Sequence, residues 1–328
     1  STSIGLGMRL LKQVKGINFG PQITTWQSLI THVAEAGEML EINGEEFTMS
    51  CVTISLSEFG SFFDPSNREL VDNLTDMWDG KLGTIVKETK TNGSDTMVNP
   101  WINILACTTP EWISDNFNRS LVGTGFGSRP VFVYADRPNE FISYPKRNQT
   151  DKREQKTREL DLVEGLQEIA KLKGEYLLTE EAYEWGDQWY VQFMENLLKN
   201  PNKTEAGFQG RRQTHVHKLA MVISASKGEF PMISKEILQE AEQRVRELDK
   251  DVTQIFSFIG QSALSRTARE MMEILSAKRS ILKQSMYRTY FFRSMTVKEF
   301  DEALASAEAT GQVVKSDGSE NPLLIYKG

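Results

Sequence analysis

"CVTISLSEFGSFF" at residues 51–63 and "WINILACTTPEW" at residues 101–112 are the two stretches that decide the fold. Each opens as a short apolar run rich in β-branched residues and then turns polar, which is the pattern of a buried strand. Helical patterns lie before and between them. Strands that alternate with helices over residues 1–136 predict an α/β layer with a largely parallel sheet.

The bulk composition is that of a folded globular protein. The chain has 328 residues, of which 39% are hydrophobic and 25% are charged, so we expect two or three domains. No run approaches 18 apolar residues, and we expect a cytoplasmic protein with no membrane partner. The net charge of −7 argues against indiscriminate coating of nucleic acid, although a local basic channel remains compatible with it.

The remaining segments complete the predicted organisation. Asn-Gly pairs at 43–44 and 92–93 predict two hairpins, and the apolar residues 131–135 predict a further strand. Residues 149–262 are almost wholly helical. Residues 263–328 show three helices followed by a hairpin, which is the winged-helix pattern, and Thr296 with Glu299 predicts a capping box for the third helix. The predicted domains are therefore 1–148, 149–262 and 263–328.

Polar residues at the ends of the two apolar strands are candidates for nucleotide hydrolysis. Glu58 follows the first strand, where a carboxylate would be exposed at the carboxyl edge of a parallel sheet and could polarise water. Thr108 and Thr109 follow the next strand and could contact the γ-phosphate or the attacking water. The alternatives are a solvated strand-end Glu58 and an ordinary Thr-Thr-Pro strand exit.

Three arginines are candidates for stabilising charge on a transferring phosphoryl group. Arg129 follows the glycine-rich "GTGFGS" and precedes an apolar run, where it could act as an arginine finger toward a neighbouring subunit. The alternative is a structural arginine that pairs with a loop carboxylate. Arg211 and Arg212 in the helical region could supply a second cation, and a solvated helix face is the alternative.

The hairpin predicted over residues 83–100 carries lysines that suit contact with nucleic-acid phosphates. Lys81 precedes it, and Lys87 and Lys90 lie near its tip. Glu88 and Asp95 dilute this charge, so a plain surface hairpin is the alternative. The third helix of the C-terminal domain is acidic, which favours packing or partner contact there over major-groove reading.

Several stretches together resemble a known group of proteins. "TISLSEFGSFF", "LTDMWDG", "KETKTNGSDTMVNPWINILACTTPEWI" and "GFGSRPVFVY" are similar to the phage- and plasmid-encoded helicase-like ATPases often found in primase-helicase proteins. That group belongs with the AAA+ ATPases, near superfamily III helicases. The resemblance covers roughly residues 1–140, and "RRQTHVHKLAMVI" with "SKEILQEAEQRV" follows more loosely. It implies an α/β P-loop core, an all-α lid and a winged-helix domain.

The resemblance also implies roles for individual residues. Glu58 falls on the water-activating Walker B glutamate, with Ser57 where Asp is usual, and Thr108 or Thr109 falls on the sensor position where Asn is commoner. Arg129 falls on the arginine finger, and Arg211 or Arg212 on the second sensor of the lid. Lys87 and Lys90 fall on the hairpin that such helicases point into the central pore of a ring, commonly a hexamer.

The first two residues match the end of a phosphate loop. Such a loop reads G-x-x-x-x-G-K-[ST] and opens directly into a helix. Ser1 and Thr2 stand where a helical pattern begins, so we expect a Gly-Lys and a strand ahead of them, with Ser1 as the hydroxyl ligand of Mg²⁺. The alternative is a native start after removal of Met, with Ser as a helix cap.

The sequence therefore predicts an ATP-dependent helicase or translocase of phage or plasmid replication, with ATP and Mg²⁺ bound at subunit interfaces of a homo-oligomeric ring. The expected partners are single-stranded or forked DNA and a primase domain or protein. Two alternatives remain open. One is an AAA+ replication initiator, loader or protein-remodelling ATPase, and the other is a DNA-binding assembly module without hydrolysis.

Overall fold

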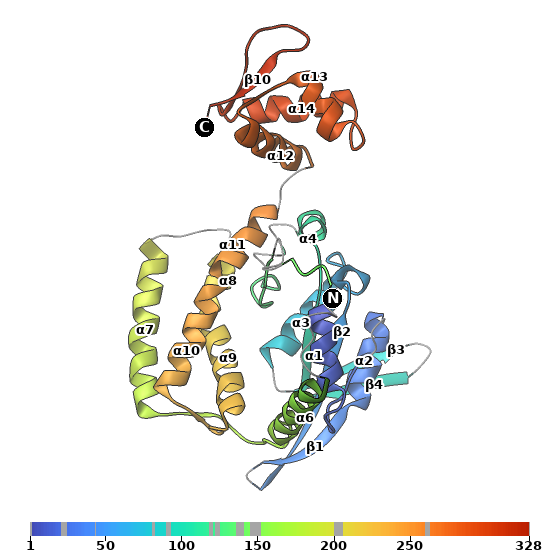
Figure 1. Cartoon of the computed structure of the whole chain (residues 1–328). Coiled ribbons are helices and arrows are strands. Elements are labelled where there is room, and N and C mark those ends of the chain that lie inside the picture. Colours follow the sequence, from blue (N-terminus) through green and yellow to red (C-terminus); the bar gives the residue numbers. More distant parts are fainter. Residues whose placement is uncertain are drawn as a thin grey trace. The chain divides into compact units, whose positions relative to one another are not determined.

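The computed structural model describes residues 2–20, 25–42, 44–80, 83–89, 93–117, 121, 125–135, 141–144, 152–199, 206–259 and 263–327. The protein is a mixed α/β chain with small sheets (Figure 1). It divides into two compact units, Ser1–Ile259 and Gly260–Gly328, each with its own hydrophobic core. Among these residues, no helix combines the length and the apolar content needed to cross a membrane.

The first part of the larger unit contains both strands and helices. Its elements are α1 (Thr2–Leu11), α2 (Trp26–Glu35), β1 (Gly37–Ile42), β2 (Glu45–Leu56), α3 (Arg68–Asp79), β3 (Thr84–Thr89), β4 (Gly93–Val98), β5 (Pro100–Ala106) and α4 (Pro110–Asn116). The second part is mainly helical, with α6 (Lys152–Ile169), β6 (Leu177–Leu178), α7 (Glu180–Lys199), α8 (Ala206–Gly210), α9 (Arg212–Lys227), β7 (Met232–Ile233), α10 (Lys235–Glu247) and α11 (Asp249–Phe258).

The central strand of the main sheet is β2. It pairs antiparallel with β1 through the predicted hairpin and parallel with β5, in a register that sets Leu56 opposite Ala106. Phe19 forms a single parallel bridge with Thr53, on the side of β2 that faces away from β5. The predicted parallel pairing is thus confirmed. The sheet itself has three strands, one of them antiparallel, and is smaller than the largely parallel layer that the alternating pattern predicted.

Helix α3 lies in the chain between β2 and the hairpin that precedes β5. Its N-cap is Asn67, whose side chain accepts a hydrogen bond from the main-chain N–H of Leu70. It ends at Gly80, which has a φ of +64°. A side chain at Gly80 would meet the Trp101 ring at 2.4 Å, so only glycine fits between the helix end and β5.

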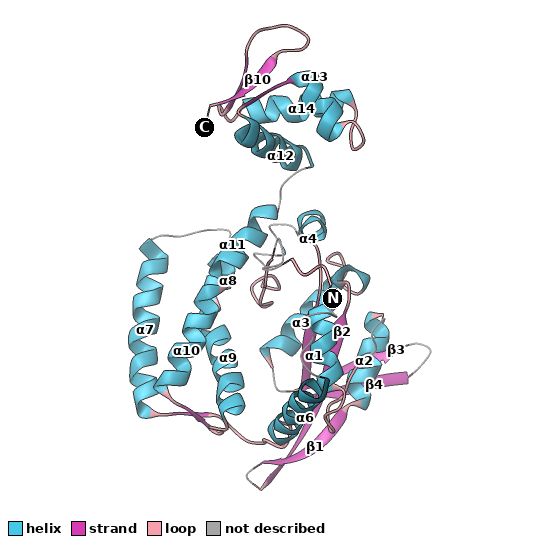
Figure 2. Ribbon diagram, in the orientation of Figure 1, coloured by secondary structure: helices cyan, strands magenta, loops and turns pink. Residues whose placement is uncertain are grey.

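The hairpin β3–β4 lies between α3 and β5 in the chain, as predicted. Its register sets Lys87 opposite Asp95, and its predicted turn falls partly outside the described residues. Asp95 accepts a hydrogen bond of 2.9 Å from the hydroxyl of Thr31 on α2. Figure 2 shows the hairpin as a separate strand pair beside α2, extending away from the main sheet.

The strand predicted over residues 131–135 is not formed. These residues alternate as a strand would, with Phe132 and Tyr134 partly buried and Val131 and Val133 exposed, Val133 to 77%. Among the described residues, however, no strand pairs with them. The N–H of Tyr134 instead donates to the carboxylate of Asp251 on α11 (3.2 Å). The apolar alternation therefore predicted the burial pattern and not the hydrogen bonding.

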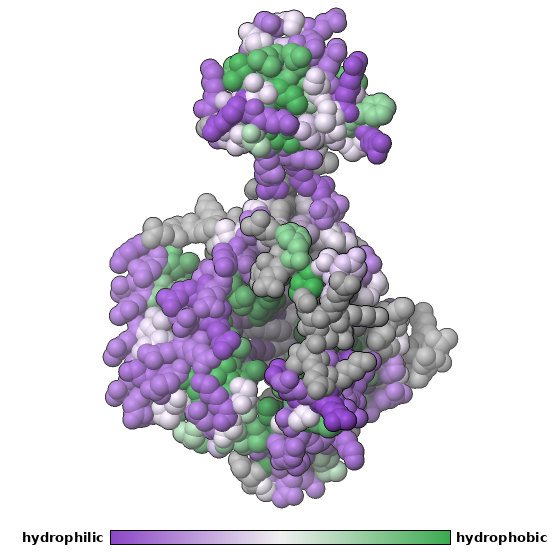
Figure 3. Space-filling view, in the orientation of Figure 1, coloured by the Kyte–Doolittle hydropathy of each residue, from purple (hydrophilic) through white to green (hydrophobic). Residues whose placement is uncertain are grey.

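The helices of the second part of the larger unit contribute to two separate hydrophobic clusters. Helices α7, α9 and α10 share one apolar cluster, whereas α8 and α11 contribute Phe208, Val252 and Phe256 to the core beneath the main sheet. The α8 and α11 residues tie the mainly helical segment to the strand-rich segment. Figure 3 shows that the outer surface of α7 is largely hydrophilic.

The smaller unit combines helices with a short antiparallel sheet. Its elements are α12 (Ala263–Lys278), β8 (Ser280–Leu282), α13 (Lys283–Met286), a π-helical turn (Tyr287–Phe291), α14 (Val297–Glu308), β9 (Val313–Lys315) and β10 (Leu323–Tyr326). The sheet order is β8-β10-β9. The predicted capping box is confirmed, because the Thr296 hydroxyl accepts from the Glu299 N–H and the Glu299 carboxylate accepts from the Thr296 N–H.

Candidate functional site

Glu58 and Thr108 lie together at the carboxyl edge of the parallel pair β2–β5. Cys107 donates its N–H to the carbonyl oxygen of Leu56 (3.1 Å), and its own carbonyl accepts from the N–H of Phe59 (2.7 Å). These bonds continue the strand pairing past the last residues of both strands. The side chains of Glu58 and Thr108 are both exposed. The structure thus brings the two predicted residues to one edge.

Local geometry separates the roles of the two threonines. Thr109 is the N-cap of α4, and its hydroxyl accepts from the N–H of Trp112 (3.2 Å). The Thr108 hydroxyl and the Glu58 carboxylate form no hydrogen bond with the described part of the chain. They are therefore the groups at this edge that remain available to a ligand, while Thr109 is occupied by capping.

An aromatic platform supports this edge. Phe59 stacks on Phe63 at 4.7 Å, and Phe63 stacks on Phe126 at 4.6 Å. Trp112 lies edge-on to Phe59 at 5.5 Å. A side chain at Gly60 would meet the Trp112 indole at 2.2 Å, so the tight turn after Glu58 depends on glycine. Packed rings with fixed rotamers hold the backbone of Glu58 in place.

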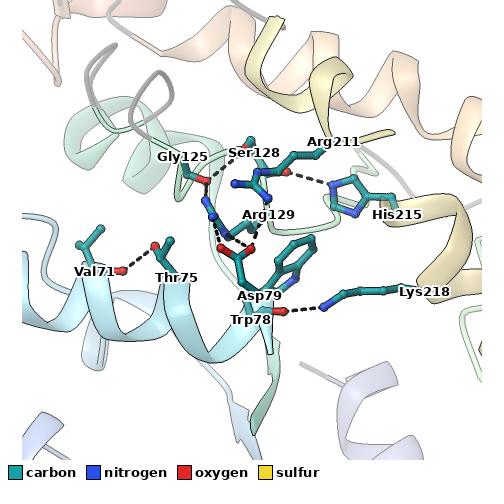
Figure 4. A network of polar contacts seen from close by, with 10 residues as sticks. All are labelled: Val71, Thr75, Trp78, Asp79, Gly125, Ser128, Arg129, Arg211, His215 and Lys218. Carbon is teal, nitrogen blue, oxygen red and sulfur yellow. Dashed lines mark hydrogen bonds and ion pairs between the residues drawn. The ribbon is translucent and has the colours of Figure 1, made fainter. Parts of the chain in front are cut away.

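A second group of polar residues, here called the basic cluster, consists of Trp78, Asp79, Arg129, Arg211 and Lys218 (Figure 4). Arg129 makes a two-pronged ion pair with Asp79, with Nε–Oδ1 at 3.0 Å and Nη2–Oδ2 at 2.6 Å. It also donates to the carbonyl of Gly125 and is only 5% exposed. Arg211 reaches the same carboxylate at 3.3 Å. One carboxylate on α3 therefore holds two arginines from distant parts of the chain.

Lys218 adds a third cation to the basic cluster. Its Nζ donates to the carbonyl of Trp78 (2.6 Å) and lies 3.8 Å from the Trp78 ring centroid and 4.5 Å from that of Trp101. Burial lowers the pKa of Lys218 to about 8; Asp79 acts to raise it, and the arginines Arg129 and Arg211 lower it further. The cluster carries more positive than negative charge.

His215 is buried beside this cluster. Its Nε2 lies 2.9 Å from the carbonyl oxygen of Ser128, to which it donates, and its ring stacks on Phe208 at 4.9 Å. Burial lowers the pKa of His215, and the neighbouring cations lower it further, while the bond to Ser128 acts to raise it. The neutral imidazole therefore ties α9 to the loop that carries Arg129.

The pKa of Lys218 predicts a measurable pH dependence of stability. The unfolded chain keeps this proton up to the ordinary pKa of 10.5, whereas the folded chain releases it near 8. Between these values the unfolded chain binds more protons, so the group's contribution to the free energy of unfolding becomes more favourable as pH rises. We expect Lys218→Met to remove this rise in urea unfolding between pH 8 and 10. If the free energy of unfolding changed equally with pH in both proteins, the lowered pKa of Lys218 would be contradicted.

The carboxyl edge and the basic cluster lie at opposite ends of β5. Thr108 is two residues beyond Ala106, the last residue of this strand, whereas Trp101, which touches Lys218, is its second residue. Seven strand residues at about 3.3 Å each place roughly 20 Å between the two ends. Among the described residues of one copy, Arg129 and Arg211 pair with Asp79, and no contact joins either of them to Glu58. The finger and sensor roles stay predictions.

The other predicted residues are placed as follows. Arg212 is 3% exposed and pairs with Asp249 (2.7 Å) and Glu242 (3.6 Å) inside the helical part, so its charge is already compensated. Lys87 lies on β3 opposite Asp95. Thr2 is the first residue of α1. Ser1, Lys81 and Lys90 lie outside the described residues.

Sequence reasoning missed the two residues that organise the basic cluster. Asp79 lies within "LTDMWDG", where it received no role, and Lys218 lies within "HVHKLAMVI". Arg129 is 50 residues from Asp79, and Arg211 is 132 residues from it. The one local signal was a carboxylate at the last helical residue before Gly80, where a helix end disfavours negative charge.

Comparison with known proteins adds no identification. No protein-family model matches the chain. No curated protein matches it in sequence.

Proposed function

We propose that this chain is the motor part of an ATP-driven translocase or helicase that acts on nucleic acid, with an AAA+ type P-loop core, a helical lid and a winged-helix domain. The observation that carries this proposal is the parallel pairing of β2 and β5, which sets Glu58 beside Thr108 at one sheet edge. In α/β folds ligands bind at the carboxyl ends of parallel strands. The helices and antiparallel sheet of the smaller unit are compatible with the winged-helix part.

The chemistry of the edge fits water activation. A carboxylate and a hydroxyl that are exposed and free of hydrogen bonds to the described chain can both bind one water. Glu58 would orient that water and accept its proton, and Thr108 would hold it in line. ATP would supply the phosphoryl group, with Mg²⁺ neutralising its charge and Ser1 as the hydroxyl ligand.

The pairing of Arg129 with Asp79 is the basis for proposing a ring of copies. A cation is needed near the transferring phosphoryl group, and among the described residues Arg129 contacts Asp79 and not Glu58 of its own chain. Arg129 and Arg211 would therefore act on the nucleotide of a neighbouring copy, as in a homo-hexamer. Arg129 would have to leave its ion pair with Asp79 to do so.

Nucleic acid is the proposed substrate because the β3–β4 hairpin is inserted between the two strands that carry Glu58 and Thr108. In this proposal, hydrolysis at the edge would move the hairpin. Lys81, Lys87 and Lys90 would contact the phosphates of single-stranded or forked DNA. The proposed setting is phage or plasmid replication in the host cytoplasm, with a primase domain or protein as partner. ATPase activity measured with and without single-stranded DNA is the first experiment.

Charge reversal in the hairpin tests the nucleic-acid role. Lys87→Glu together with Lys90→Glu should remove the stimulation of ATPase activity by single-stranded DNA and leave the unstimulated rate within about twofold. The reason is that the lysines contact the phosphates and not the nucleotide. Lys12→Glu, an exposed lysine after α1, is the matched control and should keep the stimulation.

Protein remodelling or replication loading is the second candidate function. The observation that favours it is the register of the hairpin, which places the acidic residue Asp95 opposite Lys87. The acidic net charge of −7 points the same way. A remodelling ATPase would show no DNA stimulation and no response to the lysine reversals. The ion pair between Arg129 and Asp79 favours the third candidate, a DNA-binding module without hydrolysis. Such a module would show no ATPase activity with or without DNA.

A further inference from the structure

The two units of the chain carry net charges of opposite sign. Residues 260–328 hold 10 Lys and Arg against 8 Asp and Glu, whereas residues 1–259 hold 28 against 37. The chain as a whole has a net charge of −7, so the smaller unit is its basic part. This asymmetry favours contact between the smaller unit and a negatively charged partner.

The positive charge of the smaller unit is concentrated in one stretch. Between residues 274 and 298 the sequence has six Lys and Arg and neither Asp nor Glu. Lys283 in this stretch pairs with Asp301 on α14 at 2.8 Å, so its charge is compensated. Arg288 and Arg293 are exposed, and neither forms an ion pair with the residues that the structure describes. Their charge is therefore available to a partner.

A π-helical turn brings two aromatic rings to the surface of the same stretch. The N–H of Phe292 donates to the carbonyl of Tyr287 (2.8 Å), five residues earlier, so the helix that continues α13 contains one extra residue here. With this extra residue, Met286 and Phe291 are both buried although they are five residues apart. In a straight α-helix Tyr290, four residues after Met286, would take the buried place. Instead Tyr290 is 39% exposed and Phe292 is 65% exposed.

Contacts with the core of the unit fix the position of this helical stretch. The hydroxyl of Tyr287 donates to the carbonyl of Met295 (3.0 Å), and its ring lies edge-on to Phe300 on α14 at 5.2 Å. The same ring lies edge-on to Phe292 at 6.4 Å and so supports it from one side. The exposed ring of Phe292 is therefore part of the packed structure of the unit.

Arg288, Tyr290, Phe292 and Arg293 together are called the basic-aromatic face below. Arg288 precedes Phe292 by four residues and Tyr290 precedes Arg293 by three, which are the spacings of neighbours on a helix surface. Guanidinium groups bind phosphates through charge-assisted hydrogen bonds, and flat apolar rings stack on nucleic-acid bases. In a duplex the bases already stack on one another, so exposed rings suit a single strand.

We propose that the basic-aromatic face binds single-stranded nucleic acid. Arg288 and Arg293 contact the phosphates, and Tyr290 and Phe292 stack on the bases. Helix α14 does not take part, because its four carboxylates would repel phosphates. The proposal rests neither on ATP hydrolysis nor on the lysines of the β3–β4 hairpin, which belong to the other unit.

Fluorescence anisotropy of a labelled oligothymidylate, measured with the full chain and without nucleotide, tests the proposal. Arg288→Gln together with Arg293→Gln should weaken binding about tenfold. It should also lower the slope of log affinity against log salt concentration by about 1.4, because two phosphate contacts are lost. Lys298→Gln with Lys327→Gln is the matched control, since it removes two exposed positive charges from other parts of the same unit and should change neither quantity.

A substitution in the aromatic part tests base stacking separately. Phe292→Leu should weaken oligothymidylate binding about tenfold, because a stacked base loses its ring while an apolar side chain remains. Val297→Ala is the control for the loss of exposed apolar surface, since Val297 is 54% exposed on α14, and the affinity should stay unchanged. Both substitutions change exposed side chains, so the core of the unit remains packed.

Three results would overturn the proposal: no binding of oligothymidylate, equal losses for the arginine pair and the lysine pair, or unchanged affinity in Phe292→Leu. Competition by an unlabelled duplex as strong as that by an unlabelled single strand would also overturn it. The hairpin variant Lys87→Glu with Lys90→Glu should still lose affinity when the arginine pair is replaced as well. A chain that binds through the basic-aromatic face but hydrolyses no ATP would contradict the proposed function and leave this inference standing.

Discussion

Glu58→Gln is expected to reduce ATP turnover by about a hundredfold or more while ATP binding remains. The amide keeps the size and hydrogen-bonding reach of the carboxylate but cannot accept a proton from water. Because the Glu58 side chain is exposed and makes no hydrogen bond within the described chain, its replacement should not change stability. Phosphate release measures turnover, and equilibrium binding of a fluorescent ATP analogue measures ATP binding. Both are compared between the variant and the unmodified protein.

Glu111→Gln is the matched control for this prediction. Glu111 is an exposed carboxylate in the first turn of α4, two residues after Thr109 and therefore near the same sheet edge. Its neutralisation should leave turnover within about twofold, since it does not end a strand. If the Glu58→Gln variant turned over ATP at a rate close to that of the unmodified protein, the proposed hydrolytic role of this edge would be contradicted.

Asp79→Asn is expected to destabilise the larger unit by about 3–5 kcal/mol. The substitution removes the carboxylate that pairs with the arginines of the basic cluster, and it leaves Arg129, which is 5% exposed, without a counter-ion among the described residues. Arg211 and Lys218 lose the same carboxylate, so repulsion among the three cations increases. Urea unfolding followed by tryptophan fluorescence measures the loss. All six tryptophans lie within residues 1–259, so the signal reports this unit alone.

Two variants give this prediction its controls. Asp72→Asn changes an exposed carboxylate on the same helix and should cost less than about 0.5 kcal/mol. Adding Arg129→Met to Asp79→Asn should recover part of the lost stability, because the unpaired buried charge is then removed as well. A loss below about 1 kcal/mol for Asp79→Asn alone would show that the ion pair is dispensable.

Local elements were predictable because each depends on neighbours in the chain. The hairpins β1–β2 and β3–β4, the Gly80 end of α3 and the Thr296–Glu299 capping box all follow from turn and cap chemistry within a few residues. The adjacency of Glu58 and Thr108 was also predictable, since two buried strands joined by a helix pair in parallel. The segment 131–135 shows the limit of this reasoning, because a strand requires a partner that alternation alone does not supply.

The amino-acid sequence by itself determined the strand and helix segments, the parallel pair and the place of the carboxyl edge, because hydrophobic period and turn residues act locally. Only the tertiary structure decided where Arg129, Arg211 and Lys218 point. Their shared carboxylate, Asp79, is 50 residues from Arg129 and 132 from Arg211, and no local pattern encodes such a contact. An arginine's charge is free or compensated according to what packs around it, so the same sequence position fits a finger or an internal ion pair until the fold brings Asp79 within 2.6 Å.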